Sequence, residues 1–404
     1  MSKLAIHGGE KTTDIQWPKW PIWDDTERNA LLDAFDSGEW WYGERVKQFE
    51  EQFAAFQDAK FGITASSGTT AIETALAALE IGPSDEVIIP PYTFVATASA
   101  VLRVGAIPVF ADIEPDTWGL DINAVKRKIT PRTKAIMPVH LGGRIVDMDA
   151  FNTLGHERNL LIIEDACHSW GGKWKGKGTG ALGRCGMFSF QVSKNIASAE
   201  GGIILTDDEA LADMCRSITN CGRTIGGEWY GHANIGSNLR LTEFQAAILL
   251  GQLSRLEEHT LRREANGAYL TEALQQIPHI CVTREDPRIT RRSYHLYTFR
   301  VDLNGLGITR ERFVEALTAE GVPASVGYTR PLYKHAVFQN LREMRANPGI
   351  KLDYVNDMDC PVCEQLCEDT VWLFHTLLLA NRSDMDDIVR AVQKVVAHVE
   401  ELQN

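Results

Sequence analysis

Short apolar runs recur between residues 61 and 205 and constrain the fold more than any other feature of the sequence. The runs are three to five residues long, and helical patterns of apolar residues separate most of them. Uninterrupted apolar strands are typical of a parallel sheet covered by helices on both faces. The sequence therefore predicts an α/β fold with a mainly parallel, seven-stranded sheet between helices. The predicted strands cover residues 61–65, 86–89, 107–110, 135–139, 160–163, 187–190 and 203–205.

The N-terminal segment, residues 4–23, is irregular and carries three tryptophans between residues 17 and 23. Such a segment is unfavourable in water, so it is expected to pack on the body of the protein or on a partner subunit. A helix over residues 27–35 follows, with Asp24 or Asp25 as its N-cap.

A long helical pattern begins near Thr242 and continues past residue 265. At 404 residues the chain is long enough for two domains. We expect the N-terminal segment and the large domain in residues 1–255, and a smaller α+β domain in residues 256–404. The last helix is predicted to start at Ser383 as N-cap.

Composition excludes several classes of function. The formal net charge of −13 argues against binding to nucleic acid or to an anionic membrane. No apolar run approaches the roughly 20 residues of a membrane span, and the chain opens without the apolar core of a signal peptide. We therefore expect a cytoplasmic protein with free thiols, no membrane partner and no nucleic-acid partner.

Three of the eight cysteines cluster as Cys360, Cys363 and Cys367. This spacing is compatible with the start of a zinc or iron–sulfur site, but no fourth ligand is evident nearby. The four-residue separation of Cys363 and Cys367 also suits buried thiols on one helical face. We interpret the cluster as structural and predict no metal site.

Lys194 follows the apolar run at 187–190 and precedes a glycine pair at 201–202. A lysine at a strand end in an α/β sheet can face the crevice where ligands bind. Burial there would lower the pKa of its amine and make it a nucleophile towards an aldehyde. The alternative is an ordinary surface lysine in a loop.

Asp165 closes the apolar run that starts at residue 160, so we expect it at the same edge of the sheet. A carboxylate there can keep a heteroaromatic ring nitrogen protonated; alternatively, it caps the next loop. His168, three residues later, is a candidate contact to the same ligand, although a histidine is also common as a hydrogen-bonded core residue.

The stretch Ser66-Ser-Gly-Thr-Thr70 lies between a predicted strand and a predicted helix. Free backbone N–H groups and the helix dipole at such a turn favour a phosphate, and Ser189 can add a hydroxyl. Phe94 is a candidate for stacking on a ligand ring, or else a core phenylalanine. Together these groups meet the requirements of pyridoxal phosphate (PLP), which is the predicted cofactor.

Six motifs occur in order along the chain. They are Ser-x-Gly-Thr-x-Ala at 66–71, Tyr-Thr-Phe-x-Ala-Thr at 92–97, Glu-Asp-Ala-x-His at 164–168, Phe-Ser-Phe-x-x-x-Lys-Asn at 188–195, Glu-Gly-Gly at 200–202 and Gly-Ser-Asn-Leu-Arg-Leu-Thr-Glu-Phe-Gln-Ala-Ala at 236–247. In combination they resemble the PLP-dependent sugar aminotransferases of the DegT/StrS family over nearly the whole chain. The resemblance implies an aspartate aminotransferase-like fold. The sequence departs mildly from the family's motifs at two positions. Ala199 stands where the family frequently has glycine, and Gln191 stands where it frequently has histidine.

The resemblance implies a role for each candidate residue. Lys194 would bind the cofactor covalently and act in catalysis, and Asp165 would pair with its ring nitrogen. Asn238 would complete the phosphate site from a second subunit, which implies a homodimer with shared active sites. The other implied cofactor contacts are Thr69, Thr70, Phe94, His168 and Ser189, and the implied substrate contacts are Trp41, Tyr42, Arg240 and Tyr328.

Three further segments resemble one branch of the family and indicate a class of substrate. The segments at 17–21 and 371–380 and the tryptophan pair at 40–41 resemble the branch of the family that acts on keto-cyclitols such as scyllo-inosose or 2-deoxy-scyllo-inosose. This implies ping-pong transfer of an amino group from glutamate or glutamine, as in aminoglycoside or amino sugar biosynthesis. One alternative is a nucleotide-linked 3- or 4-keto-sugar as acceptor, and another is a non-catalytic PLP-binding regulator. A PLP-dependent sugar dehydratase would carry histidine where Lys194 stands.

Overall fold

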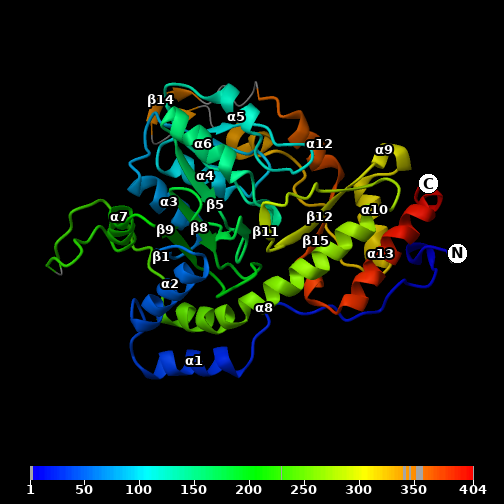
Figure 1. Cartoon of the computed structure of the whole chain (residues 1–404), viewed down its shortest axis with the longest axis horizontal. Coiled ribbons are helices and arrows are strands. Elements are labelled where there is room, and N and C mark those ends of the chain that lie inside the picture. The colour runs from blue at the N-terminus through cyan, green and yellow to red at the C-terminus, as the bar shows by residue number, and fades with distance from the viewer. Residues whose placement is uncertain (1–2, 229, 340–342, 345–346, 352–357, 404) are drawn as a thin grey trace.

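The computed structural model describes residues 3–228, 230–339, 343–344, 347–351 and 358–403. A large sheet with its helices forms one part of the molecule, and a smaller sheet with its own helices forms the other (Figure 1). Helix α8 (Glu243–Leu274) runs diagonally from beneath the large sheet to the small one. It is capped at Thr242 and is 32 residues long, which confirms the predicted long helix.

The large sheet has the seven predicted strands. They are β1 (Phe61–Ala65), β2 (Glu86–Ile89), β3 (Ile107–Phe110), β4 (Thr133–Ile136), β5 (Leu161–Asp165), β8 (Cys185–Ser189) and β9 (Gly202–Thr206), in the order β1-β9-β8-β5-β4-β2-β3. Only β9 runs antiparallel to its neighbours, because residues 190–201 return the chain from β8 without a crossover helix. The carboxyl ends of β5 and β8 and the start of β9 therefore meet at one edge of the sheet.

Helices cover both faces of this sheet, as the apolar strands predict. Adjacent residues of β9 face opposite sides: Ile204 lies in the core that contains α3, and Ile203 lies in the core that contains α2 and α8. The helices of this part are α1 (Asp25–Asp36), α2 (Glu44–Phe56), α3 (Gly68–Ala78), α4 (Ala96–Arg103), α5 (Ile122–Lys128), α6 (Met148–Arg158) and α7 (Glu209–Thr219).

A second core lies under a three-stranded antiparallel sheet. Its strands are β10 (Ile280–Val282), β12 (Leu296–Val301) and β15 (Thr370–Phe374), and helices α10 (Arg310–Ala319) and α13 (Arg382–Ala397) pack against it with the end of α8. Helix α12 (Pro361–Asp369) contributes instead to the large core. Helix α8 is continuous across residues 255 and 256, and the predicted domain division there stays a prediction.

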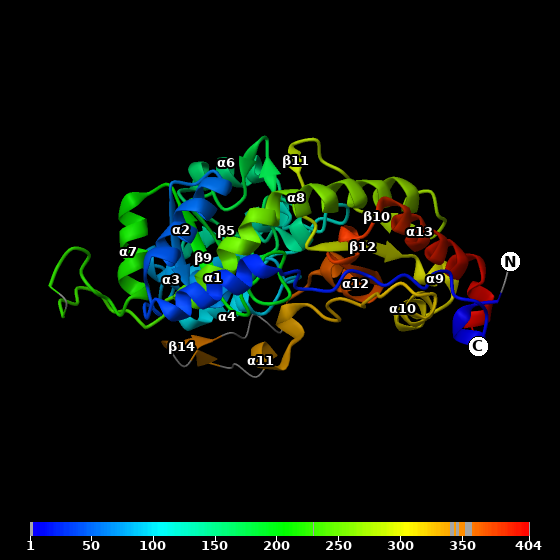
Figure 2. The same cartoon turned by 90° about the horizontal axis from the view of Figure 1, so that it is seen from below.

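The remaining elements are short. They are β6 (Lys173–Trp174), β7 (Lys177–Gly178), β11 (Ile289–Arg291), β13 (Glu343–Met344), β14 (Asn347–Lys351), α9 (Leu303–Leu306), α11 (Ala336–Gln339) and 3-10 turns at Ala5–His7, Leu141–Gly143, Leu332–Lys334, Leu377–Leu379 and Val399–Leu402. The N-terminal segment runs past the small sheet and along α8 to α1 (Figure 2).

Two predicted helix starts have different outcomes. Asp24 is the N-cap of α1, where its side chain accepts from the Thr26 backbone N–H, as predicted. The prediction of Ser383 as the cap of α13 is wrong, because Asn381 is the N-cap. The Asn381 backbone N–H donates to Asp384 at 2.8 Å, so the helix starts two residues earlier and Ser383 lies inside its first turn.

Candidate active site

A cavity of about 500 Å³ lies at the sheet edge where β5 and β8 end. The start of α3 forms another part of its wall, and β15 and residues 295–296 contribute from the small sheet. Of the residues predicted from the sequence, the cavity wall includes Thr69, Phe94, Asp165, His168, Ser189, Lys194 and Tyr328.

Lys194 reaches this cavity from the loop between β8 and β9. Its backbone N–H donates to the Gln191 carbonyl at 2.9 Å, which forms a tight turn. Burial lowers the pKa of its amine, while the nearby Cys167 and Asp165 act in the opposite direction. A lowered pKa raises the neutral fraction of this amine at a given pH, and the neutral amine is the form that attacks an aldehyde.

Asp165 is the last residue of β5 and is buried. The Thr97 hydroxyl donates to its Oδ2 at 2.7 Å, and the Cys167 backbone N–H donates to its Oδ1 at 3.2 Å. Two donors on different oxygens thus fix the plane of the carboxyl group. Thr97 was not among the predicted site residues, although it lies within the motif at 92–97.

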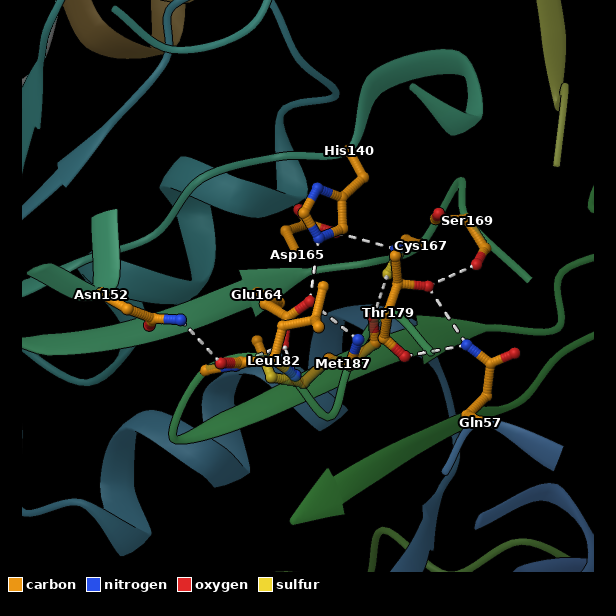
Figure 3. Close-up of polar contacts among 12 residues, drawn as sticks. Gln57, His140, Asn152, Glu164, Asp165, Cys167, Ser169, Thr179, Leu182 and Met187 are labelled. Atoms are coloured by element: carbon orange, nitrogen blue, oxygen red, sulfur yellow. Dashed lines mark hydrogen bonds and ion pairs between the residues drawn. The ribbon is translucent and has the colours of Figure 1, made fainter. Parts of the chain in front are cut away.

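A buried pair behind Asp165 anchors the end of β5 (Figure 3). His140 and Glu164 are both fully buried, and His140 Nε2 lies 2.9 Å from the Glu164 carboxylate. Backbone N–H groups of Gly180, Leu182 and Gly183 also donate to that carboxylate. Because the His140 backbone N–H donates to the Asp165 carbonyl at 3.1 Å, this pair holds the strand that presents Asp165.

The start of α3 has the form of an anion site. Ser67 caps the helix, and Thr69 and Ser189 line the cavity beside it. A Cβ atom on Gly68 would lie 2.7 Å from that of Ser189, so only glycine permits this close approach. The Thr70 hydroxyl, by contrast, accepts from the Ser67 backbone N–H at 3.0 Å, and Thr70 is not part of the cavity wall.

Three further predicted residues line the cavity: His168, Phe94 and Tyr328. His168 Nδ1 accepts from the Gly142 backbone N–H at 3.3 Å, so its proton is on Nε2. Burial, and secondarily the Lys194 charge, keeps the pKa of His168 well below its usual value. Phe94 is 57% exposed, and Tyr328 packs edge-on against Trp372 with ring centroids 4.7 Å apart.

Four predicted residues lie away from this cavity within the chain. Trp41, Tyr42 and Arg240 line a second cavity of about 290 Å³, where the Arg240 guanidinium lies 5.1 Å from the centre of the Trp41 ring. Asn238 pairs with Asn220 in an isolated bridge. One chain by itself does not bring these residues to Lys194, so their roles depend on the predicted second subunit.

The described ranges contain no helix long and apolar enough to cross a bilayer. In the same ranges no group of three or more His, Cys, Asp and Glu side chains is arranged to hold a metal ion. Cys360, Cys363 and Cys367 are buried free thiols that pack in the large core around α12.

Comparison with known proteins shows which family and which solved structures this chain is similar to. The model of the DegT/DnrJ/EryC1/StrS aminotransferase family matches residues 21–393. The L-glutamine:2-deoxy-scyllo-inosose aminotransferase of Micromonospora echinospora is 37% identical over 421 residues, which cover 100% of both chains. The 3-amino-5-hydroxybenzoate synthase of Amycolatopsis mediterranei (strain S699) is 35% identical over 95% of this chain and 98% of that protein. A crystal structure of 3-amino-5-hydroxybenzoic acid synthase superposes with a TM-score of 0.86 and 35% identity, covering 95% of this chain and 99% of the other.

Proposed function

Because the chain belongs to the DegT/DnrJ/EryC1/StrS aminotransferase family, we propose that it transfers the amino group of glutamine to a keto-cyclitol, with PLP as its cofactor. The observation that carries this proposal is one cavity in which Lys194, Asp165 and the start of α3 converge. The acceptor class is supported by the 2-deoxy-scyllo-inosose aminotransferase of Micromonospora echinospora, which aligns with this chain over the whole length of both proteins.

The residues of the cavity fit PLP. The backbone N–H groups at the start of α3, with Thr69 and Ser189, are suited to the phosphate, and Gly68 leaves room for it. Asp165 would pair with the ring nitrogen, and Phe94 offers an aromatic face. His168 carries its proton on Nε2, which makes it a donor for the ring oxygen.

When bound, PLP supplies an aldehyde and an electron-withdrawing ring. Lys194 would bind the aldehyde, yield it to the amino donor and then move the proton from the donor α-carbon as a general base. Asp165 would keep the ring nitrogen charged throughout, with Thr97 holding its carboxylate in place.

The acceptor is tested with glutamine labelled with ¹⁵N in its α-amino group. We expect the label to appear in the aminocyclitol formed from scyllo-inosose or 2-deoxy-scyllo-inosose, measured by mass spectrometry. Nucleotide-linked 3- and 4-keto-sugars, offered separately, serve as controls. Transfer of label only to the nucleotide-linked ketones would contradict the proposed acceptor, and glutamate in place of glutamine tests the donor.

We also propose a homodimer in which each active site uses residues of both subunits. The support is that Asn238 and Arg240 are not part of the wall of the cavity that holds Lys194. Both belong to the stretch of chain between α7 and α8, part of which projects from the body (Figure 1). This segment exposes Ile225, Tyr230 and Ile235. Exposed apolar side chains of this size are typical of an interface.

Mixing two inactive variants tests the shared site. Lys194→Ala chains and Asn238→Asp chains, refolded together, form mixed dimers in which one of two sites has both intact residues. Random assortment should therefore restore about a quarter of the wild-type rate. Wild-type protein refolded in parallel is the control, and mixtures that stay as inactive as the parents would contradict a shared site.

A further inference from the structure

The loop that carries Lys194 is exposed at the two residues before it. Val192 is 43% exposed, and Ser193 is also exposed. Within the loop, the Val192 backbone N–H donates to the Ala199 carbonyl at 3.0 Å. The carbonyl groups of Val192 and Ser193, by contrast, accept from side chains that are distant in the sequence.

Trp20 and His375 provide those two donors. The Trp20 indole N–H donates to the Val192 carbonyl at 2.8 Å. His375 Nε2 lies 3.1 Å from the Ser193 carbonyl, and the Trp20 and His375 rings pack edge to face with centroids 4.6 Å apart. The N-terminal segment and the end of β15 thus hold adjacent peptide groups of the lysine loop.

Arg263 selects the tautomer of His375. Its Nη2 lies 3.1 Å from His375 Nδ1, and because a guanidinium can only donate, Nδ1 must accept. The imidazole proton is then on Nε2, where it faces the Ser193 carbonyl. Arg263 is fully buried on α8, and its guanidinium also lies 5.5 Å from the centre of the Trp20 ring. Burial, and next the Arg263 charge, holds the pKa of His375 well below its usual value, so the ring stays neutral.

The N-terminal segment is fixed at its other end. The Glu320 carboxylate is fully buried and accepts from the backbone N–H groups of Ala5 and Thr12, and Lys394 pairs with it at 2.8 Å. Trp17 in the same segment donates to the Gly321 carbonyl at 2.8 Å. Trp20 therefore reaches the lysine loop from an anchored strap, residues 4–23, and not from a loose terminus.

We propose that Trp20 and His375 are positioning residues for Lys194, and that Arg263 acts by setting the His375 tautomer. The inference rests on the proposed role of Lys194, which must meet both a cofactor atom and a substrate proton from one backbone position. A displacement of about 1 Å in such a group can lower the rate about a hundredfold. Two bonds to the peptide groups at 192 and 193 restrict that displacement.

Hydrogen–deuterium exchange of the peptide covering residues 190–198, in cofactor-free protein, tests this directly. Trp20→Phe retains an aromatic ring but removes the N–H donor together with part of the indole ring system, a loss of volume that Trp17→Phe reproduces. His375→Phe retains a ring without either hydrogen bond, whereas His375→Gln retains an N–H near the Nε2 position. We expect exchange about tenfold faster in both phenylalanine variants and near wild type in His375→Gln, as the loss of one or two hydrogen bonds allows.

Trp17→Phe is the matched control, since it removes an indole hydrogen bond of the same length from the same strap but away from the loop. If it accelerates exchange at 190–198 as much as Trp20→Phe does, or if Trp20→Phe has no effect, the proposal is wrong. If His375→Phe does not fold, Trp20→Phe alone tests the proposal, because Trp20 is only partly buried and its replacement should be tolerated.

Measurements with the cofactor-loaded enzyme separate this inference from the proposed function. We expect Trp20→Phe to lower kcat about tenfold with little change in KM for the amino donor, because the loop moves the base and not the binding surface. Normal PLP binding and kcat in Trp20→Phe would overturn the positioning role while leaving the proposed function intact. Failure of the wild-type protein to bind PLP would overturn the proposed function, and the exchange result would still stand.

Discussion

Lys194→Ala is expected to lower the rate of amino transfer by more than about four powers of ten, because one amine both binds the cofactor aldehyde and moves the proton. Burial lowers the pKa of this amine. A lower pKa means a larger neutral fraction at a given pH, so PLP should bind covalently at lower pH than to an exposed lysine. Steady-state and single-turnover assays with glutamine measure the loss of rate.

Borohydride reduction of the PLP-loaded protein identifies the lysine independently of activity. We expect the pyridoxyl group on the peptide that contains Lys194, located by mass spectrometry. Lys173→Ala is the matched control, since Lys173 lies outside the cavity and pairs with Asp58 at 3.1 Å. It should keep the wild-type rate. A label on any other lysine, or an active Lys194→Ala enzyme, would refute the assignment.

Asp165→Asn is expected to keep PLP bound but to slow amino transfer by about three powers of ten. The amide is close to the carboxylate in size, and its one oxygen can still accept from the Cys167 backbone N–H. Its NH2 group would stand where Oδ2 accepts from Thr97, and it can donate to the Thr97 hydroxyl once that hydroxyl rotates. It has no negative charge, so it cannot hold a proton on the ring nitrogen. The predicted effect therefore falls on the reaction and not on folding.

Single-turnover absorption changes with glutamine measure this effect. Asp149→Asn serves as the control, because Asp149 pairs with Lys175 at 2.6 Å away from the cavity. Its rate should match wild type. A near wild-type rate in Asp165→Asn would mean that Asp165 only caps the loop after β5, which is the alternative that the sequence left open.

The sequence by itself determined the sheet and placed two residues of the candidate site, Lys194 and Asp165, at its edge. Uninterrupted apolar runs have few stable solutions other than strands buried on both faces, so all seven strands were predictable. Lys194 and Asp165 were predictable because each follows such a strand, and the carboxyl ends of parallel strands meet at one edge. Both predictions depend only on the order of neighbouring residues along the chain and not on contacts between distant segments.

Only the tertiary structure decided which side chains support those two residues. Thr97 and Asp165 are 68 residues apart, and His375 and Ser193 are 182 apart. Such pairs depend on how strands and helices pack, and packing leaves no periodic signal in a single sequence. The tertiary structure likewise turned Thr70 to its own helix cap and separated Arg240 from Lys194 within one chain. The physical reason is that side-chain direction follows from the packed backbone, whereas strand and helix formation follow largely from neighbouring residues.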